Sequence, residues 1–380
     1  MTRLSKALLL LLPTLLLTCM LSGCGDTTDL SAQAFVTAMG IDYQDGQYVV
    51  HVQTLDFSSI AKSESPKSMK PSVWVGVGRG KSIHTATNQI AISTQSTLNF
   101  EQVKVVIVRE PAMVKMDEIL DAVNRVRVTR YTSWIFGTRG EMMDLLTSSA
   151  FFNLSQLYSL MYSPETQAKQ SSSVPPVTMQ TFVADYNEKA VTALLPSIGV
   201  TQDTWHENAK PITVQELDGV FAFKGKNKPL YLPLKQTLGI RFASNSFKRA
   251  VYAVQNKGDG TDVVTIRHMK VKKKVRMNNG RPTFELQVKA KGELTEMGNS
   301  LTLSQLEVKI REIIRTEINQ TYAAGVERGA DLFNLEETLY RYHLRQWKKT
   351  ASAGGWHPHE NDLKVSVSFK IIHAGVFEMK

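Results

Sequence analysis

The chain has 380 residues, of which 42% are apolar and 21% charged, a composition that excludes a disordered tail and a polytopic membrane protein. Lys and Arg outnumber Asp and Glu by 45 to 35, which gives a formal net charge of +10. The two cysteines, Cys19 and Cys24, both lie near the N-terminus, so neither a disulfide nor a cysteine-bound zinc ion can stabilise the rest of the chain.

The first residues have the features of a lipoprotein signal peptide. Arg3 and Lys6 supply positive charge, and the apolar run 7–21 is too short and too interrupted, by Pro13 among others, for a comfortable membrane span. The sequence Leu21-Ser22-Gly23-Cys24 that follows resembles a lipobox. We therefore predict a signal peptide over 1–23.

Processing at the lipobox would cleave between Gly23 and Cys24 and leave diacylglycerol on the Cys24 thiol, with or without a further N-acyl chain. An uncleaved anchor helix is the alternative, and it would keep the protein on the same side of the same membrane. No later hydrophobic run is long enough to cross a bilayer, so we expect the mature chain to be anchored to the membrane surface. Because the chain is expected to be exported, we predict no nucleic-acid partner.

The N-terminal half mixes strand and helix patterns without a regular βαβ repeat, which predicts an α+β fold. A hairpin is expected around Asp45-Gly46, where the turn needs positive φ. The expected strands are 34–41, 47–57, 73–77, 103–108, 191–195 and 214–223, and the expected helices are 82–96, 116–125, 140–162 and 179–188. The Ser- and Pro-rich stretches 58–72 and 163–176 are expected to be exposed loops.

The most basic stretch of the chain is predicted to be one strand of a hairpin that turns at Asn279-Gly280. In this register Val275 faces Phe284, Val271 faces Val288, and Lys274 lies opposite Glu285. One polar face of the strand then carries four cations, Lys270, Lys272, Lys274 and Arg276. Two interpretations remain open: these charges solvate an edge strand, or they contact lipid or a partner protein.

A helix is predicted to begin after this hairpin. Ser304 and Glu307 have the spacing of a capping box, and Leu303 and Val308 that of a hydrophobic staple. A second helix is expected over 331–347. The alternating residues 363–372 predict a half-buried antiparallel strand that closes the C-terminal unit.

Two motifs suggest chemistry, but each has a plainer explanation. The stretch 75–82 resembles the end of a phosphate-binding loop, yet Val75 occupies the place of its first glycine, so a helix capped by Ser82 is favoured. His357, His359 and Glu360 lack further metal ligands nearby, which favours a polar turn. No nucleophile elbow or coupled carboxylate pair stands out, so we predict no catalytic residue, no metal and no cofactor.

The order of several segments resembles the Ger(x)C family, the C-subunit lipoproteins of nutrient germinant receptors in spore-forming bacteria. The segments that carry the resemblance are Ala38-Met39-Gly40-Ile41-Asp42, Tyr48-Val49-Val50-His51-Val52-Gln53, Gly80 with Ala86, 100–110, Leu217-Asp218-Gly219-Val220-Phe221-Ala222-Phe223-Lys224, Asp331-Leu332-Phe333, Arg341, Trp347, Trp356 and the strand that leads to Gly375. Two departures are Gly25-Asp26 after the lipobox cysteine and the lack of a glycine after Phe333.

The resemblance implies a three-domain α+β protein of mixed and antiparallel sheets with packed helices, and we expect domains over 24–200, 201–260 (a middle domain or connection) and 261–380. It also implies a non-catalytic subunit that is anchored by Cys24 on the outer face of the spore inner membrane. Its partners would be an A-type subunit and a multispanning B-type subunit, and its role would be in spore germination. The alternative is an exported lipoprotein of another class, such as a solute-binding protein or a cell-wall enzyme.

Overall fold

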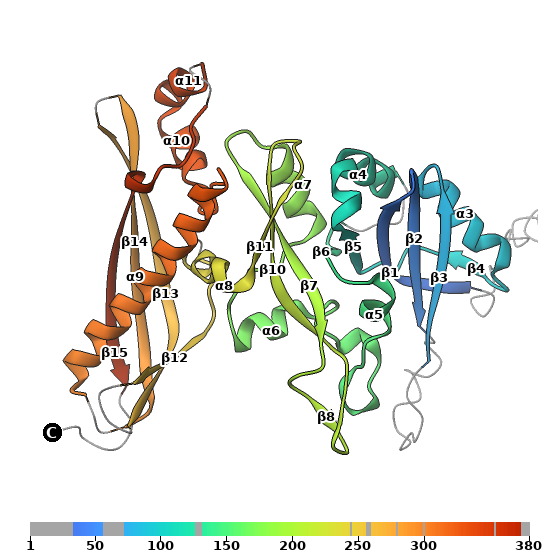
Figure 1. The fold of residues 1–380 in the computed structure, drawn as a ribbon, viewed down its shortest axis with the longest axis horizontal. Coiled ribbons are helices and arrows are strands. Elements are labelled where there is room, and N and C mark those ends of the chain that lie inside the picture. The colour runs from blue at the N-terminus through green and yellow to red at the C-terminus, as the bar shows by residue number, and fades with distance from the viewer. Residues whose placement is uncertain are drawn as a thin grey trace, which may run out of the picture.

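The computed structural model describes residues 33–55, 72–125, 131–243, 245–255, 260–278, 280–298, 301–352 and 355–373. The two main sheets of the described residues follow one another along the long axis of the molecule (Figure 1), and we call them the large sheet and the small sheet. Helices pack on both, so the α+β fold class predicted from the sequence is confirmed.

Within the described residues, nine strands form the large sheet in the order β11-β10-β7-β6-β5-β1-β2-β3, with β4 beside the start of β1. Its centre is parallel (β7, β6, β5, β1), and antiparallel strands flank it on both sides. The strands are β1 (Gln33–Gln44), β2 (Gln47–Leu55), β3 (Val73–Gly80), β4 (Thr97–Asn99), β5 (Val105–Arg109), β6 (Trp134–Thr138), β7 (Thr192–Thr201), β10 (Val214–Lys224) and β11 (Leu230–Pro233).

Helices cover both faces of the parallel strands, which explains why β5 is apolar at almost every position. One face is buried under α3 (Ile83–Ser93), α4 (Met116–Arg125) and α7 (Met179–Asn187). The other is buried under α5 (Met142–Thr147) and the segment that follows it. Asp45 and Gly46 both have positive φ, as the predicted two-residue turn between β1 and β2 requires.

Two expectations for the N-terminal half were wrong. The predicted helix 140–162 ends at Thr147, because Ser148 has an extended ψ of 153°. Two 3₁₀ turns follow over Phe151–Asn153 and Gln156–Tyr158, with Phe152 in a left-handed conformation. The predicted loop 163–176 contains α6 (Pro164–Gln170) and buried residues after it. The Ser172 hydroxyl accepts the N–H groups of Lys248 and Arg249, so this segment joins the two halves of the molecule.

The small sheet has the order β12-β13-β14-β15. Its strands are β12 (Ala250–Gln255), β13 (Thr261–Asn278), β14 (Arg281–Glu296) and β15 (Leu363–His373), and the helix that covers one face is α9 (Leu303–Glu327). The β13–β14 register agrees with the sequence prediction, with Val271 opposite Val288, Lys274 opposite Glu285 and Val275 opposite Phe284.

The last strand has the predicted alternation but not the predicted direction. Val367 and Phe369 are buried and Ser366 and Ser368 exposed, as expected, yet β15 runs parallel to β14. The reason is the long helical connection between the two strands, which returns the chain to the end of the sheet where β14 began. Alternation along a strand reports which side chains are buried, not the direction of the neighbouring strand.

The helix start was also misplaced by two residues. Thr302 caps α9, forms a capping box with Gln305, and has buried Leu301 and Leu306 at the staple positions. Val308 is exposed and Ser304 lies inside the helix. The predicted single helix 331–347 is two helices, α10 (Leu335–Tyr342) and α11 (Leu344–Ser352), which are separated at His343.

The segment 201–260 contributes β10 and β11 to the large sheet and β12 to the small one. It also contains the short hairpin of β8 (His206–Glu207) and β9 (Lys210–Pro211) and the helix α8 (Leu234–Thr237). The domain boundaries at 200 and 260 stay a prediction. None of the described helices is long and apolar enough to cross a membrane.

Candidate functional site

The four cations predicted to share a face are on the side of β13 that points away from α9. Lys270, Lys272 and Arg276 are exposed, and Lys274 is half-buried. The intervening Val271 and Val275 pack against the core on the other side. β12 pairs only with the first part of β13, up to Ile266, so the basic part of β13 has β14 as its strand neighbour on one side alone.

The same face continues onto the next two strands. Lys289 lies opposite Lys270, and Lys291 is paired with Lys370 of β15. Glu285 lies between Lys274 and Lys364. We call this surface the basic face, and among the described residues its cations are Lys270, Lys272, Lys274, Arg276, Lys289, Lys291, Lys364 and Lys370.

Sequence reasoning found the four cations of β13 but missed that Lys289, Lys291, Lys364 and Lys370 join them. Apolar and polar residues alternate along β14 and β15, so each of these lysines points outward from its strand. This alternation could be recognised in the sequence of each strand separately. The parallel pairing of β14 with β15 is what brings them to one surface.

Few carboxylates balance the basic face. Glu285 lies 3.5 Å from Arg276, and Glu293 lies 3.1 Å from Arg267. A hydrogen bond from Gln287 lowers the pKa of Glu285, and the charges of Lys274, Arg276 and Lys364 lower it further. Among the described residues, no carboxylate lies within ion-pair distance of Lys270, Lys272, Lys289, Lys291, Lys364 or Lys370.

Lys273 has the opposite orientation to its neighbours on β13. Its ammonium donates to the Phe333 carbonyl in the loop before α10, and burial lowers its pKa. Burial raises the pKa of nearby Asp331 to about 6, although Asp331 accepts the Glu336 N–H at 2.8 Å. These two residues attach α10 to the sheet and belong to the core.

A second surface is apolar. Phe151 stacks edge-on against Trp205 of the β8 hairpin with ring centroids 4.7 Å apart, and Phe152 lies beside it at 6.1 Å. Phe152 is 90% exposed at φ 57°, a strained conformation for a bulky side chain. With half-exposed Leu154 these residues form what we call the aromatic patch, and exposed Asp203 and Glu207 flank Trp205 in the sequence.

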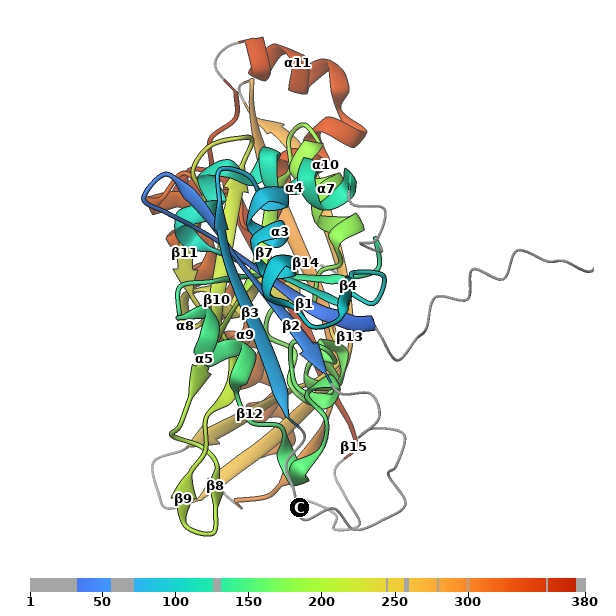
Figure 2. The ribbon, with the colours of Figure 1, turned by 90° about the vertical axis from the view of Figure 1, so that its right-hand side faces the viewer.

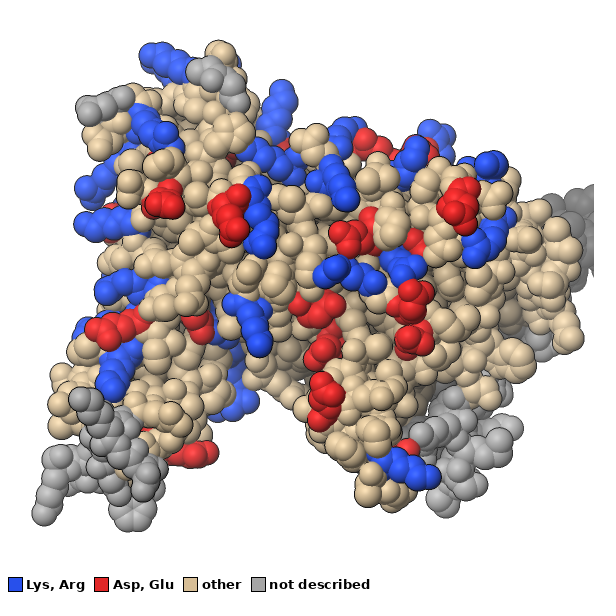
Figure 3. All heavy atoms as spheres, in the orientation of Figure 1, with Lys and Arg blue, Asp and Glu red and all other residues tan. Residues whose placement is uncertain are grey.

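Charge is unevenly distributed over the molecule. Figure 3 shows Asp and Glu side chains gathered over the middle of the face on which β7 and β8 lie, whereas Lys and Arg are frequent around the small sheet and α11.

Sequence reasoning did not find the aromatic patch, because its residues come from two segments and an exposed phenylalanine looks the same in a sequence as a buried one.

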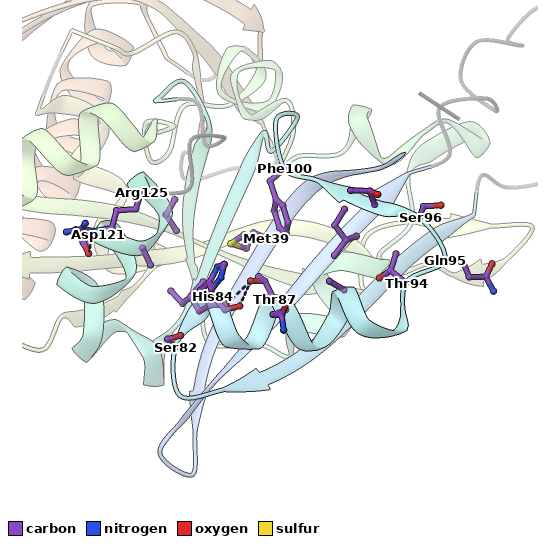
Figure 4. A pocket seen from close by; sticks show the side chains of 17 residues that line it. Met39, Ser82, His84, Thr87, Thr94, Gln95, Ser96, Phe100, Asp121 and Arg125 are labelled. Carbon is purple, nitrogen blue, oxygen red and sulfur yellow. Dashed lines mark hydrogen bonds and ion pairs between the residues drawn. The ribbon is translucent and has the colours of Figure 1, made fainter. Parts of the chain in front are cut away.

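A groove of about 940 Å³ lies between α3 and α4. Figure 4 shows Met39 and Phe100 at its apolar wall and His84, Thr87 and Gln95 along α3 and its end. Asp121 and Arg125, 2.7 Å apart, pair with each other at the margin. An apolar molecule would fit this groove, but its lining holds no group that selects one ligand class.

The two motifs that suggested chemistry have structural roles. In the stretch 75–82, a Cβ atom at Gly78 would overlap the Ala86 carbonyl oxygen, so glycine lets α3 pack closely on β3. Ser82 caps α3, as predicted. The residues around His359 form a polar turn, in which Asp362 accepts the His359 N–H and pairs with Arg281. Cys24 and Gly23 lie outside the described residues, as does Asn279.

Comparisons with known proteins cover nearly the whole chain. The family model of the spore germination protein N-terminal domain matches residues 26–200, and that of the spore germination B3/GerAC-like C-terminal domain matches residues 218–375. The chain is 25% identical to spore germination protein B3 of Bacillus subtilis (strain 168), over 93% of this chain and 95% of that protein. It is 22% identical to spore germination protein KC of the same organism, over 87% and 86%.

A solved structure shows the same fold. The crystal structure of the GerBC protein superposes with a TM-score of 0.56 and 21% identity, over 88% of this chain and 96% of that chain. The arrangement of strands and helices described above is therefore shared with a protein whose structure was determined experimentally.

Proposed function

The chain belongs to the family of GerAC-like spore germination proteins, and from this premise we propose that it is the lipid-anchored, non-catalytic C subunit of a nutrient germinant receptor. The observation that carries the proposal is the match of both family domains, in order, over one chain. The lipobox that precedes them supports attachment through Cys24.

The aromatic patch supports a role in assembly. Exposed aromatic side chains that lie together are a mark of protein interfaces, and the left-handed Phe152 is held outward at an energetic cost. Neighbouring Asp203 and Glu207 favour a partner surface that combines apolar and basic residues. We assign this surface to contact with the A-type and B-type membrane subunits, on the outer face of the spore inner membrane.

The experiment is co-purification of receptor subunits from spore inner membrane. Phe152→Ser is expected to reduce the recovered A-type and B-type subunits at least tenfold while the variant chain stays in the membrane. Ile92→Ser is the matched control, since Ile92 is an exposed apolar residue of α3 outside the patch. Equal recovery with both variants would exclude the aromatic patch as the contact.

Anchoring is tested separately. Cys24→Ala should abolish incorporation of radiolabelled fatty acid and leave the chain as precursor or release it from the membrane. Persistent labelling of this variant would contradict attachment through Cys24. Undiminished germination of spores that lack the whole chain would contradict the receptor role itself.

A further inference from the structure

The basic face carries more cations, on more strands, than are needed to protect an edge strand from pairing with another sheet. A few charges on one strand suffice to prevent edge-to-edge pairing of sheets. Here the cations extend over β13, β14 and β15, and successive ones on a strand are about 7 Å apart while strands are about 5 Å apart. The result is a continuous array of positive charge on one face of the small sheet, at one end of the molecule.

The pairing within this array is unfavourable for folding. Lys270 faces Lys289 and Lys291 faces Lys370 directly across neighbouring strands, and like charges in such pairs destabilise a sheet. A sequence selected for stability alone would place a carboxylate at one member of each pair. The repulsion is relieved when a surface of negative charge lies against the face.

We propose that the basic face lies flat on the anionic headgroup surface of the lipid bilayer. This inference deepens the proposed function, in which the chain is anchored to the same membrane. Each lysine near such a surface would strengthen binding about fivefold, through attraction that acts over a Debye length of about 8 Å at physiological ionic strength.

The composition of the face favours lipid over protein. Apart from Glu285 and Glu293, the outward residues between the cations are small or uncharged, including Thr283, Gln287, Ser366 and Ser368. Protein interfaces are enriched in aromatic side chains and depleted in lysine, the reverse of this surface. A layer of lipid phosphates is planar and negative, and it needs neither pockets nor apolar anchors.

The position of the face fits a two-point attachment. Figure 2 shows α9 on one side of the small sheet and the beginning of β1, where the described chain starts, toward the opposite side. The basic face is the side turned away from α9. Since the sheets follow one another along the long axis, an anchor before β1 and the basic face would hold opposite ends of the molecule on one membrane (Figure 1).

The test uses the mature chain with Cys24→Ala, without residues 1–23, so that neither an acyl anchor nor the apolar run 7–21 contributes. The vesicles are of phosphatidylcholine alone or mixed equally with phosphatidylglycerol. Co-sedimentation should show at least tenfold tighter binding to the phosphatidylglycerol vesicles, and the preference should fade as NaCl is raised. Combined replacement of Lys270, Lys272, Lys289 and Lys291 by Gln should remove most of this preference.

The matched control replaces four exposed lysines elsewhere, Lys81, Lys189, Lys210 and Lys228, by Gln, which changes the net charge equally. This variant should keep the preference. Equal loss in both variants would mean that net charge alone directs binding, and it would overturn the proposal, as would equal binding of the starting chain to both vesicles. Neither result would contradict the proposed receptor function, because co-purification of the subunits tests that function independently.

A second readout guards against misfolding. Because Lys289 and Lys291 face like charges, Lys289→Gln with Lys291→Gln should leave the melting temperature unchanged or raise it. A variant that loses vesicle binding while its melting temperature is maintained supports the lipid contact. If binding and melting temperature fall together in every combination of these lysines, the residues have a structural role and the proposal fails.

Discussion

Single side chains connect elements that are far apart in the sequence. Arg241 donates to the Ser172 carbonyl and pairs with Glu317 of α9 at 2.6 Å, while Tyr252 of β12 donates to the same carboxylate. Lys273 and Asp331 likewise join β13 to the loop before α10. These polar groups fix how the helices sit on the small sheet.

The cap of α9 gives a direct test of one such residue. Thr302→Ala removes the hydroxyl that accepts the Gln305 N–H, so it should lower the free energy of unfolding by about 1 kcal/mol. Ser304→Ala, at the position that the sequence pattern favoured, should change it by less than about 0.5 kcal/mol. Urea unfolding of the purified variants measures both. The reverse order would place the cap at Ser304.

Asp185 of α7 makes stability depend on pH. Burial and then the nearby Glu337 carboxylate raise its pKa from 3.8 to about 6. The folded chain therefore holds a proton that the unfolded chain loses between about pH 4 and pH 6, and stability decreases as the pH rises through this window. Asp185→Asn removes this decrease.

At pH 7 Asp185→Asn should raise the free energy of unfolding by about 1 kcal/mol, a value reduced for partial exposure to solvent. Below pH 4 the variant and the starting chain should be equal. Denaturant unfolding across this pH range measures the difference, with exposed Asp144→Asn as the control. Parallel pH profiles for Asp185→Asn and the starting chain would contradict the assignment.

At the scale of elements, α9 organises the C-terminal half. One side of this helix buries Leu306, Ile310, Ile314 and Ile318 against the small sheet, and Gly239 packs against its backbone at Glu317. Its length also explains the topology, since it is the first part of the connection that makes β15 parallel to β14.

Removal of one contact of α9 tests this role. Ile310→Ala should lower the free energy of unfolding by about 2–5 kcal/mol, because Ile310 is fully buried and leaves a cavity. Val308→Ala, on the exposed side of the same helix, should change it by less than about 0.5 kcal/mol. Equal effects in thermal or urea unfolding would mean that α9 packs on a different face.

At the scale of the whole molecule, the surfaces divide by chemistry. The basic face covers the small sheet, and the aromatic patch with its acidic neighbours lies at the β8 hairpin and the segment after α5. A subunit held on a lipid surface by one region is free to meet protein partners with another. We therefore predict that mutations in the basic face weaken lipid binding without loss of the partner subunits, and that mutations in the aromatic patch have the opposite effect.

Folding should need no metal ion. Among the described residues, no three potential ligands from His, Cys, Asp and Glu come together, and the apolar cores of both sheets are extensive. We expect EDTA and reductant to leave the melting temperature of the purified chain unchanged. A decrease of several degrees with EDTA that zinc or calcium reverses would contradict this.

Much of the local structure was determined by the sequence itself, because it depends on periodicity and turn chemistry. Helix α4 was predicted with its observed ends, the Asp45-Gly46 turn has the positive φ values expected, and the β13–β14 register is as predicted. These features involve residues that are close in the chain, where side-chain spacing carries the information.

Only the tertiary structure decided what depends on contacts between distant segments. The direction of β15, the burial of Ser172 and the union of lysines from three strands on one face all follow from how elements pack after they form. A lysine that points outward from a strand looks the same in the sequence whether its neighbour across the sheet is a glutamate or another lysine. That neighbour is set by strand order and register, and the basic face therefore became visible only in the folded chain.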